Sequence, residues 1–201
     1  MDQSPIEFYF DFSSPYGYFA STRIEALAAE FDRSVVWRPI LLGPIFKLVG
    51  VVPLVEAPMK GQYCVRDFAR TARLFDIPYD HPKHFPIAAV GAARAMLWIA
   101  SHHGQAKAVD FAHKAFHAFY AEQRDIGNAD VVAALGADLG LDTGELTQGM
   151  SEPAIKEALK KQVEDAIARG VFGSPYIIVD GEPFWGFDRF DHIRRWMRVN
   201  R

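Results

Sequence analysis

Strand-forming sequence is confined to the two ends of this chain, which limits its possible folds more than any other feature. Near the start, large apolar residues at every second position over 6–12 have the alternation of a strand. A second apolar run covers 35–42, and a helical stretch from Pro15 to about Phe31 lies between the two. Two strands joined by a helix-length crossover predict a β-α-β unit.

The end of the chain predicts a hairpin followed by a helix. Apolar runs at 175–179 and 182–186 flank Asp180-Gly181, a dipeptide suited to a two-residue turn. An amphipathic stretch over 188–197 then predicts a closing helix. This β-β-α unit can complete one mixed sheet with the strands at the start.

The sequence between the two units is helical and shows little strand signal. Helical patterns, separated by Pro-rich or Gly-rich stretches, cover 61–76, 88–103, 106–122, 128–139 and 152–169. We therefore expect an α/β protein in which residues 1–42 and 171–201 form the sheet domain. Residues 43–170 would then form a large all-helical insertion.

Composition excludes several classes of function. The chain has 201 residues and a net charge of −3, with scattered Lys and Arg, so it lacks the basic footprint of nucleic-acid binding. Its first residues lack the basic and apolar regions of a signal peptide, and no stretch approaches the roughly 18 apolar residues of a membrane span. We expect a cytoplasmic protein that binds neither nucleic acid nor membrane.

The single cysteine, Cys64, limits the redox chemistry of the chain. One thiol can form neither an internal disulfide nor a dithiol couple. Cys64 lies in a helical stretch, where we expect a small buried apolar side chain. A dithiol oxidoreductase is therefore excluded.

Two hydroxyls and a proline stand where the first predicted strand leads into the first helix. Pro15 suits the first turn of a helix, and Ser13 or Ser14 suits the N-cap. The N–H groups and dipole at a helix start also attract anions, to which a hydroxyl can donate a hydrogen bond. Ser14 is therefore either a plain cap or a donor in an anion-binding site, and both interpretations stay open.

A second unusual junction, Ser174-Pro175, precedes the third predicted strand. A proline there leaves the strand ladder short of one donor. A cis bond would turn the backbone of Ser174 toward a peptide-like ligand, whereas a trans bond would make Pro175 an ordinary strand-entry residue.

His113 and His117 have the i, i+4 spacing of a zinc-binding pair. Lys114 stands where a metalloprotease carries glutamate, and the sequence offers no third ligand. The apolar residues around the pair predict a packed helix. We expect no metal site.

Three stretches together resemble the kappa-class glutathione transferase family: the Ser14-Pro15 junction, "VFGSP" (171–175) and "FWGFDR" (184–189). Within that family the likeness is to the 2-hydroxychromene-2-carboxylate isomerases, over nearly the whole chain and including "PMKGQY" (58–63). The resemblance implies a thioredoxin-like fold with a helical insertion, related to the DsbA oxidoreductases. Redox relatives carry Cys-x-x-Cys where this chain has Ser14-Pro15-Tyr16-Gly17, so the resemblance implies a thiol supplied by glutathione.

The resemblance also implies roles for individual residues. Ser14 would donate a hydrogen bond to the glutathione sulfur and so favour the thiolate. Further contacts to glutathione are implied for Lys60, Ser174, Pro175, Trp185, Gly186, Phe187 and Asp188. Lys47 and Phe85 match positions that line the substrate pocket, where they suit the carboxylate and the ring of a small aromatic carboxylate. Val51 stands where the family commonly has asparagine, and valine cannot make that hydrogen bond.

The implied activity is a glutathione-dependent isomerisation. Reversible thiolate addition would convert 2-hydroxychromene-2-carboxylate, or a related intermediate of aromatic degradation, to trans-o-hydroxybenzylidenepyruvate. The family also implies a homodimer. Two alternatives stay open: a kappa-type transferase or peroxidase, which would consume glutathione, and a non-catalytic thioredoxin-like binding protein in which Ser14 is only a cap.

Overall fold

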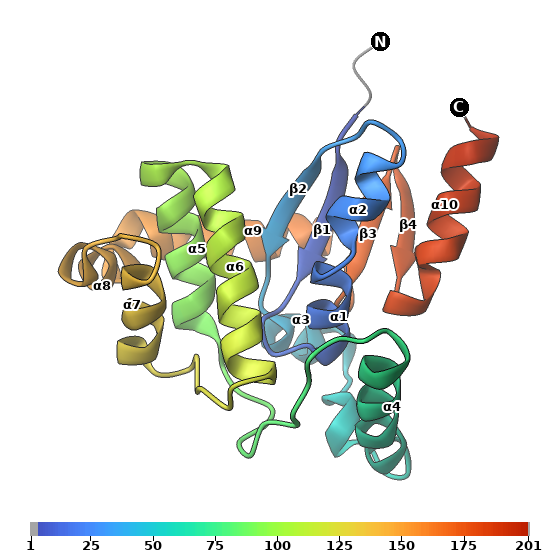
Figure 1. The fold of residues 1–201 in the computed structure, drawn as a ribbon, viewed down its shortest axis with the longest axis horizontal. Helices are drawn as coiled ribbons and strands as arrows, with labels where there is room; N and C mark the ends of the chain where they lie inside the picture. The colour runs from blue at the N-terminus through green and yellow to red at the C-terminus, as the bar shows by residue number, and fades with distance from the viewer. Residues whose placement is uncertain (1–3, 201) are drawn as a thin grey trace.

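The computed structural model describes residues 4–200, whose helices and strands are labelled in Figure 1. The strands are β1 (Ile6–Phe10), β2 (Val35–Pro39), β3 (Tyr176–Val179) and β4 (Glu182–Trp185). The α-helices are α1 (Pro15–Ser21), α2 (Ile24–Ala29), α3 (Leu42–Val49), α4 (Lys60–Leu74), α5 (Val90–His103), α6 (Gln105–Tyr120), α7 (Ala129–Ala137), α8 (Thr143–Ser151), α9 (Pro153–Ala168) and α10 (Phe190–Val199). Two short 3₁₀ helices are η1 (Leu54–Glu56) and η2 (Phe187–Arg189).

The strands form one mixed sheet in the order β2-β1-β3-β4. β1 pairs parallel with β2 and antiparallel with β3, and β3 pairs antiparallel with β4. In the centre of the sheet, Phe8 lies opposite Trp37 on one side and Ile177 on the other. The predicted β-α-β and β-β-α units therefore complete one sheet, as the sequence indicated.

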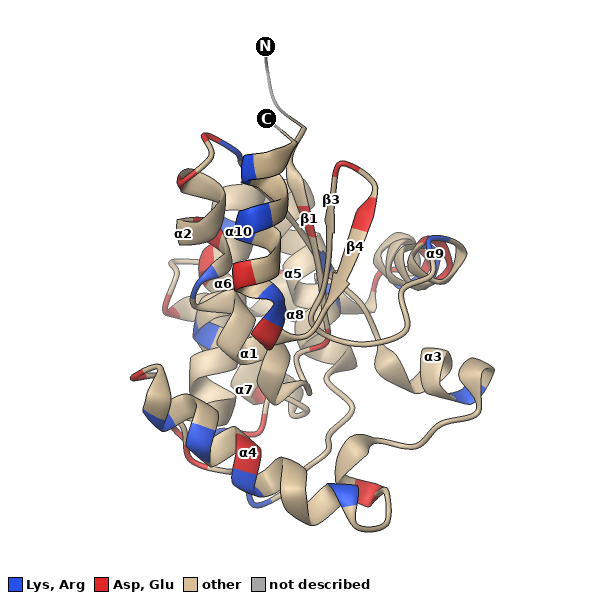
Figure 2. Ribbon diagram, turned by 90° about the vertical axis from the view of Figure 1, so that its right-hand side faces the viewer, with Lys and Arg blue, Asp and Glu red and all other residues tan. Residues whose placement is uncertain are grey.

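The alternation along β1 sends side chains to two different buried layers. Phe8 and Phe10 join a large cluster with residues of α1, α5 and α6, whereas Tyr9 joins a smaller cluster with residues of α3 and α9. Figure 2 shows the sheet between α9 on one side and α2 and α10 on the other. Phe10 contacts Phe116 of α6 at a ring-centroid distance of 5.4 Å. The boundaries between a sheet domain and an insertion stay a prediction.

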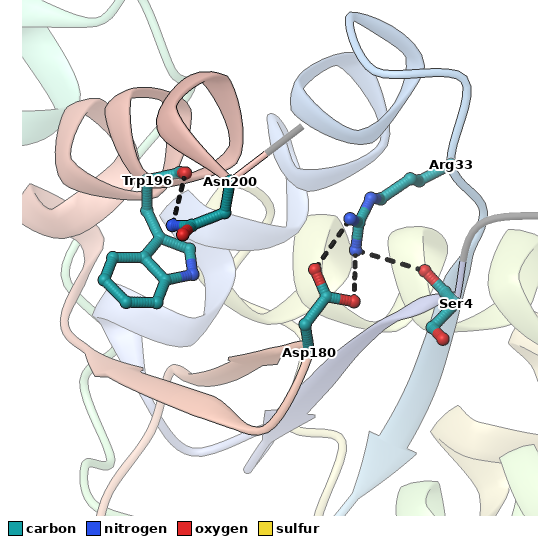
Figure 3. Close-up of polar contacts among 5 residues, drawn as sticks. All are labelled: Ser4, Arg33, Asp180, Trp196 and Asn200. Atoms are coloured by element: carbon teal, nitrogen blue, oxygen red, sulfur yellow. Dashed lines mark hydrogen bonds and ion pairs between the residues drawn. The ribbon is translucent and has the colours of Figure 1, made fainter.

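The predicted hairpin turn has the expected backbone. Asp180 and Gly181 have φ values of 53° and 87°, as a two-residue type I′ turn requires. Arg33 donates to both carboxylate oxygens of Asp180, at 2.9 and 2.7 Å, and to the Ser4 carbonyl at 3.3 Å (Figure 3). These bonds join the β3–β4 turn to the segments that precede β1 and β2.

The prediction of one continuous helix from Pro15 to about Phe31 is wrong. The structure has α1 and α2, with a break after Ser21. The Ser21 and Thr22 hydroxyls donate to the carbonyls of Tyr18 and Phe19, at 2.7 and 2.8 Å. Such local hydroxyl bonds compete with the helical pattern, which gives a physical reason for the break.

Two helices were not predicted at all. The strand predicted over 35–42 ends at Pro39, and Leu42 begins α3. α8 occupies part of the Gly-rich stretch that the sequence marked as a connection. Its start is capped by Asp142, whose side chain accepts from the Glu145 N–H at 2.8 Å.

In the described part of the chain, no helix is long and apolar enough to cross a membrane.

Candidate active site

Ser14 joins two segments that lie far apart in the sequence. It is the N-cap of α1, and its Oγ accepts from the Gly17 N–H at 3.0 Å. The same hydroxyl donates to the Ser174 carbonyl at 2.9 Å. Ser14 is therefore a cap, as one interpretation predicted, and its one proton points to the loop before β3. The Ser14 side chain is buried.

Ser174 completes this contact from the other side. The Ser174-Pro175 peptide bond is cis, the alternative under which the sequence predicted an outward-turned backbone. The Ser174 Oγ accepts from the Asp11 N–H at 3.0 Å, and the Ser174 carbonyl accepts from Ser14. Both oxygens of Ser174 are therefore hydrogen-bonded. A Cβ at Gly17 would lie 2.8 Å from Ser174 Oγ. Glycine at position 17 therefore allows α1 to approach Ser174 closely.

A buried carboxylate, Asp11, lies beside these serines and was missed in the sequence. Its two oxygens accept from the backbone N–H groups of Ser13, at 2.8 Å, and Leu42, at 2.7 Å. Burial raises the pKa of Asp11 to about 6, although the two N–H donors oppose that rise. One sequence signal could have indicated that Asp11 is buried: it stands between Phe10 and Phe12 at the end of a buried strand.

Asp11, Ser14 and Ser174 line a cavity of about 1080 Å³. Small-molecule pockets commonly have roughly 300–1,000 Å³, so this cavity lies at the upper end of that range. Its other walls come from α3, the segment 50–57, the start of α4 and the loop 85–90. Figures 1 and 2 both place α3 and α4 beyond one end of the sheet.

The cavity brings together half of the residues predicted for the site. The predicted residues among its lining are Ser14, Lys60, Phe85, Ser174 and Trp185. Val51, which replaces the family asparagine, also lines it and is 51% exposed. Five predicted residues lie outside the lining: Lys47, Pro175, Gly186, Phe187 and Asp188. Of these, Lys47 is exposed on α3. The ligand contacts expected of all these residues stay predictions.

The stretch after Trp185 forms a tight turn and part of the core. Phe187 is buried, and its ring lies 4.8 Å from that of Phe75. Gly186 has a φ of 110°, and a Cβ there would lie 2.5 Å from Asp188 Oδ1. The Asp188 side chain is 71% exposed and forms an ion pair with Arg189 at 3.2 Å. This geometry gives Gly186 and Phe187 structural roles that the sequence did not reveal.

Most of the cavity wall is apolar, and the sequence identified little of it. Apolar lining residues beyond those predicted include Leu42, Phe46, Val49, Val52, Leu54, Val55, Phe68, Ile87 and Phe172. Tyr16 adds a polar group: its hydroxyl donates to Asp67 Oδ2 at 2.6 Å. Burial and the Asp67 carboxylate raise the pKa of Tyr16, so its hydroxyl keeps its proton. Apart from Phe68 of α4, these apolar wall residues lie in the short helices α3 and η1 and in loops.

The histidines and the cysteine lie outside the cavity lining. His113 Nε2 lies 3.0 Å from Glu25 Oε2, and His117 Nε2 lies 3.5 Å from Glu122 Oε1. Among residues 4–200, no three His, Cys, Asp or Glu side chains form a group that could hold a metal ion. Cys64 is buried, as predicted, and burial raises the pKa of its thiol.

Comparison with known proteins places the chain in a family. The model of the DSBA-like thioredoxin domain matches residues 5–198. The chain belongs to the DsbA-like thioredoxin family. It is 29% identical to the 2-hydroxychromene-2-carboxylate isomerase of Sphingobium xenophagum over 201 residues, which cover 96% of this chain and 97% of that protein.

Two further relatives resemble the chain over nearly its whole length. Glutathione S-transferase kappa 2 of Caenorhabditis elegans is 29% identical over 94% of this chain and 89% of its own. The solved structure of a 2-hydroxychromene-2-carboxylate isomerase superposes with a TM-score of 0.87 and 26% identity, covering 98% of this chain and 96% of that one. The thioredoxin-like fold and the resemblance to both groups are therefore confirmed. The names of these relatives indicate an enzyme of the isomerase or transferase type.

Proposed function

We propose that the chain is a glutathione-dependent isomerase of conjugated aromatic compounds. The observation that carries the proposal is the Ser14 hydroxyl, which lines a large cavity and can donate a hydrogen bond into it. Cys64 is buried elsewhere, so the chain has no thiol of its own in the cavity. Isomerases and a kappa-class glutathione transferase among the relatives support glutathione as the source of that thiol.

The residues of the cavity fit glutathione. Glutathione supplies a nucleophilic thiol when bound, and a hydroxyl that donates to its sulfur favours the thiolate. Ser14 can take this role by turning its proton from the Ser174 carbonyl toward the cavity. Lys60 lines the same cavity and can hold a carboxylate, while Ser174 offers backbone groups for a peptide. Because α1 has only seven residues, the proposal depends on the hydroxyl more than on the helix dipole.

The wall residues would position the reacting compound. Phe85 and Trp185 line the cavity from opposite parts of the chain, and their rings can hold a flat aromatic molecule. Tyr16 stays protonated and fixed by Asp67, so it contributes a neutral surface. We propose 2-hydroxychromene-2-carboxylate as the first compound to test, because relatives with this activity match nearly the whole chain.

Conversion of 2-hydroxychromene-2-carboxylate with and without glutathione tests the proposal. An isomerase converts the compound only when glutathione is present and leaves the glutathione concentration unchanged. A glutathione concentration that falls in step with product would instead support the kappa-type transferase, the alternative favoured by the likeness to the C. elegans protein. Absence of glutathione-dependent conversion for this and related conjugated compounds would leave the thioredoxin-like binding protein. A homodimer stays a prediction that analytical ultracentrifugation can check.

A further inference from the structure

One side of the cavity is formed by α4 together with the short segment before it. Residues 54–74, named here the α4 arm, contribute five lining residues: Leu54, Val55, Ala57, Lys60 and Phe68. The two parts of the arm are closely joined, because the Gly61 N–H donates to the Ala57 carbonyl at 2.9 Å. A Cβ at Gly61 would clash with the Val55 carbonyl, so glycine allows this close approach. The arm is therefore one unit, and its position decides where these lining residues stand.

A single hydrogen bond joins the α4 arm to α1. The hydroxyl of Tyr16, in the first turn of α1, donates to Asp67 Oδ2 of α4 at 2.6 Å. In the described part of the chain, this is the only hydrogen bond between α1 and α4. The rings of Tyr16 and Phe68 also meet, with centroids 5.0 Å apart. Apolar contact is non-directional, whereas a bond from a hydroxyl to a carboxylate is directional and roughly twice as strong as a neutral one. The Tyr16–Asp67 bond therefore fixes how the arm sits on α1.

Both partners of this bond are held in place. Asp67 Oδ1 accepts from Arg70, which also donates to the Tyr63 hydroxyl at 3.0 Å. The Asp67 side chain is 21% exposed, so it is partly shielded from water. Burial and the Asp67 carboxylate raise the pKa of Tyr16, so its hydroxyl keeps the proton that it donates. Tyr16 is thus a fixed donor, and Asp67 is a fixed acceptor.

The same bond sets the spacing between Ser14 and Lys60. Ser14 caps the helix that carries Tyr16, and Lys60 begins the helix that carries Asp67. Lys60 precedes Asp67 by seven residues, which places the two on one face of α4, about two turns apart. A glutathione molecule that brings its sulfur to Ser14 and a carboxylate to Lys60 requires this spacing.

We infer that Asp67 is a positioning residue, which acts through Tyr16 to hold Lys60 and the apolar side chains of the α4 arm in register with Ser14. Asp67 lies outside the cavity lining, so it does this without contact to the ligand. The inference rests on the proposed function, because it assumes that one glutathione molecule reaches both Ser14 and Lys60.

Glutathione titration of two Asp67 variants tests the inference. Asp67→Ala removes the acceptor, whereas Asp67→Asn keeps an oxygen for the Tyr16 hydroxyl. We expect Asp67→Ala to weaken glutathione binding by about three- to ten-fold and Asp67→Asn to stay within about two-fold of the wild type. Loss of a negative charge would by itself strengthen binding of an anion, so the expected direction separates positioning from a charge effect.

Glu56→Ala is the matched control for the charge. It removes another carboxylate of the α4 arm, one that is exposed and outside the lining, and it should not weaken glutathione binding. Unchanged or tighter binding by Asp67→Ala would overturn the inference.

Double variants show whether Asp67 acts through the two named partners. We expect Tyr16→Phe to weaken glutathione binding as Asp67→Ala does, and the two changes together to weaken it no further. Lys60→Met should weaken binding in the wild type and have little further effect in Asp67→Ala, where the lysine is no longer held in register. Independent losses in these combinations would contradict a positioning role.

Amide hydrogen exchange without any ligand separates this inference from the proposed function. We expect exchange over 60–74 to be at least about two-fold faster in Asp67→Ala than in the wild type, and exchange over 90–103 of α5 to be unchanged. Faster exchange of α4 in a protein that binds no glutathione would reject the proposed function and retain the attachment of the arm. Equal exchange in a protein that does bind glutathione would retain the proposed function and reject the positioning role.

Discussion

Two parts of the cavity are built in opposite ways. The polar corner, formed by Asp11, Ser14 and Ser174, is buried, and each of its side chains is hydrogen-bonded to backbone of another segment. The apolar wall, formed by the cavity-lining residues of 42–57, is open: Val51 and Val52 are 51% and 53% exposed. A substitution in the corner disturbs several segments at once, whereas one at the exposed wall positions Val51 and Val52 mainly changes the surface that a ligand meets. The corner therefore suits chemistry, and the wall suits selectivity.

The largest effect on stability is expected from Asp11. Its pKa is raised from 3.8 to about 6 in the folded protein, so between these values the folded chain binds more protons than the unfolded chain. The free energy of unfolding therefore falls as the pH rises through this window, by on the order of 3 kcal/mol, and levels off above it. We expect that Asp11→Asn removes this decrease in the free energy of unfolding with rising pH.

Urea denaturation at several pH values between 4 and 8 measures the Asp11 effect. Asp110→Asn, at an exposed position of α6, is the matched control and should keep the pH dependence of the wild type. If Asp11→Asn also keeps it, the buried carboxyl is not the group that titrates.

A methyl group at Gly17 should break the contact between the two serines. Its Cβ would lie 2.8 Å from Ser174 Oγ, which is held by the Asp11 N–H, and 3.2 Å from Ser14 Cβ. We expect Gly17→Ala to lower the free energy of unfolding by about 1–3 kcal/mol. Gly43→Ala is the control in the apolar wall, because a Cβ at Gly43 meets nothing within 4 Å. It should lower the free energy of unfolding far less than Gly17→Ala does.

A double variant sharpens this test. Ser174→Ala removes the oxygen nearest to the new methyl group, so Gly17→Ala with Ser174→Ala should be less destabilised than the sum of the two single variants. Additive losses would show that the crowding at Gly17 does not involve Ser174.

A smaller effect is expected from Lys60, an exposed lining residue at the start of α4. Lys60 is exposed, so its pairing with a glutathione carboxylate is screened by water and salt. We expect Lys60→Met to weaken glutathione binding by about two- to five-fold at low salt, and by less at high salt. Lys156→Met, on an exposed position of α9, should leave the affinity unchanged. Equal losses in both variants would indicate a general charge effect.

The sequence predicted the corner in part, because part of it is local. Ser14 could be recognised from the strand before it and Pro15 after it, since an N-cap has a short-range signature. Its bond to Ser174 spans 160 residues and forms only because β1 pairs with β3, so no local pattern reveals it. The alternation gave no sign that Asp11 is buried, because Asp11 occupies a polar position of the strand pattern. In the structure, the turn into α3 covers it, and the Leu42 N–H donates to its carboxylate.

The apolar wall was much harder to predict. The strands and most helices have a regular apolar period, which the sequence displays. α3 begins directly after a strand and carries Pro44, so the pattern read as the end of that strand. The segment 50–57 holds only a short 3₁₀ helix, and its apolar side chains face a cavity instead of a core. Likeness to a family supplied Lys60 and Phe85, which line the cavity, and Lys47, which lies on the exposed surface of α3 and whose contact with a ligand stays a prediction.

Glutathione titration of the wild type and of Ser14→Ala, with ultraviolet thiolate absorbance read in parallel, tests the central claim most directly. The claim predicts that the wild type binds glutathione and shows a thiolate signal, which Ser14→Ala loses and Ser101→Ala, at an exposed position of α5, retains. Thermal unfolding of each variant separates this loss from the roughly 1 kcal/mol expected for a missing N-cap. An equal thiolate signal in Ser14→Ala, or no glutathione binding by the wild type, would contradict the claim that Ser14 activates a thiol.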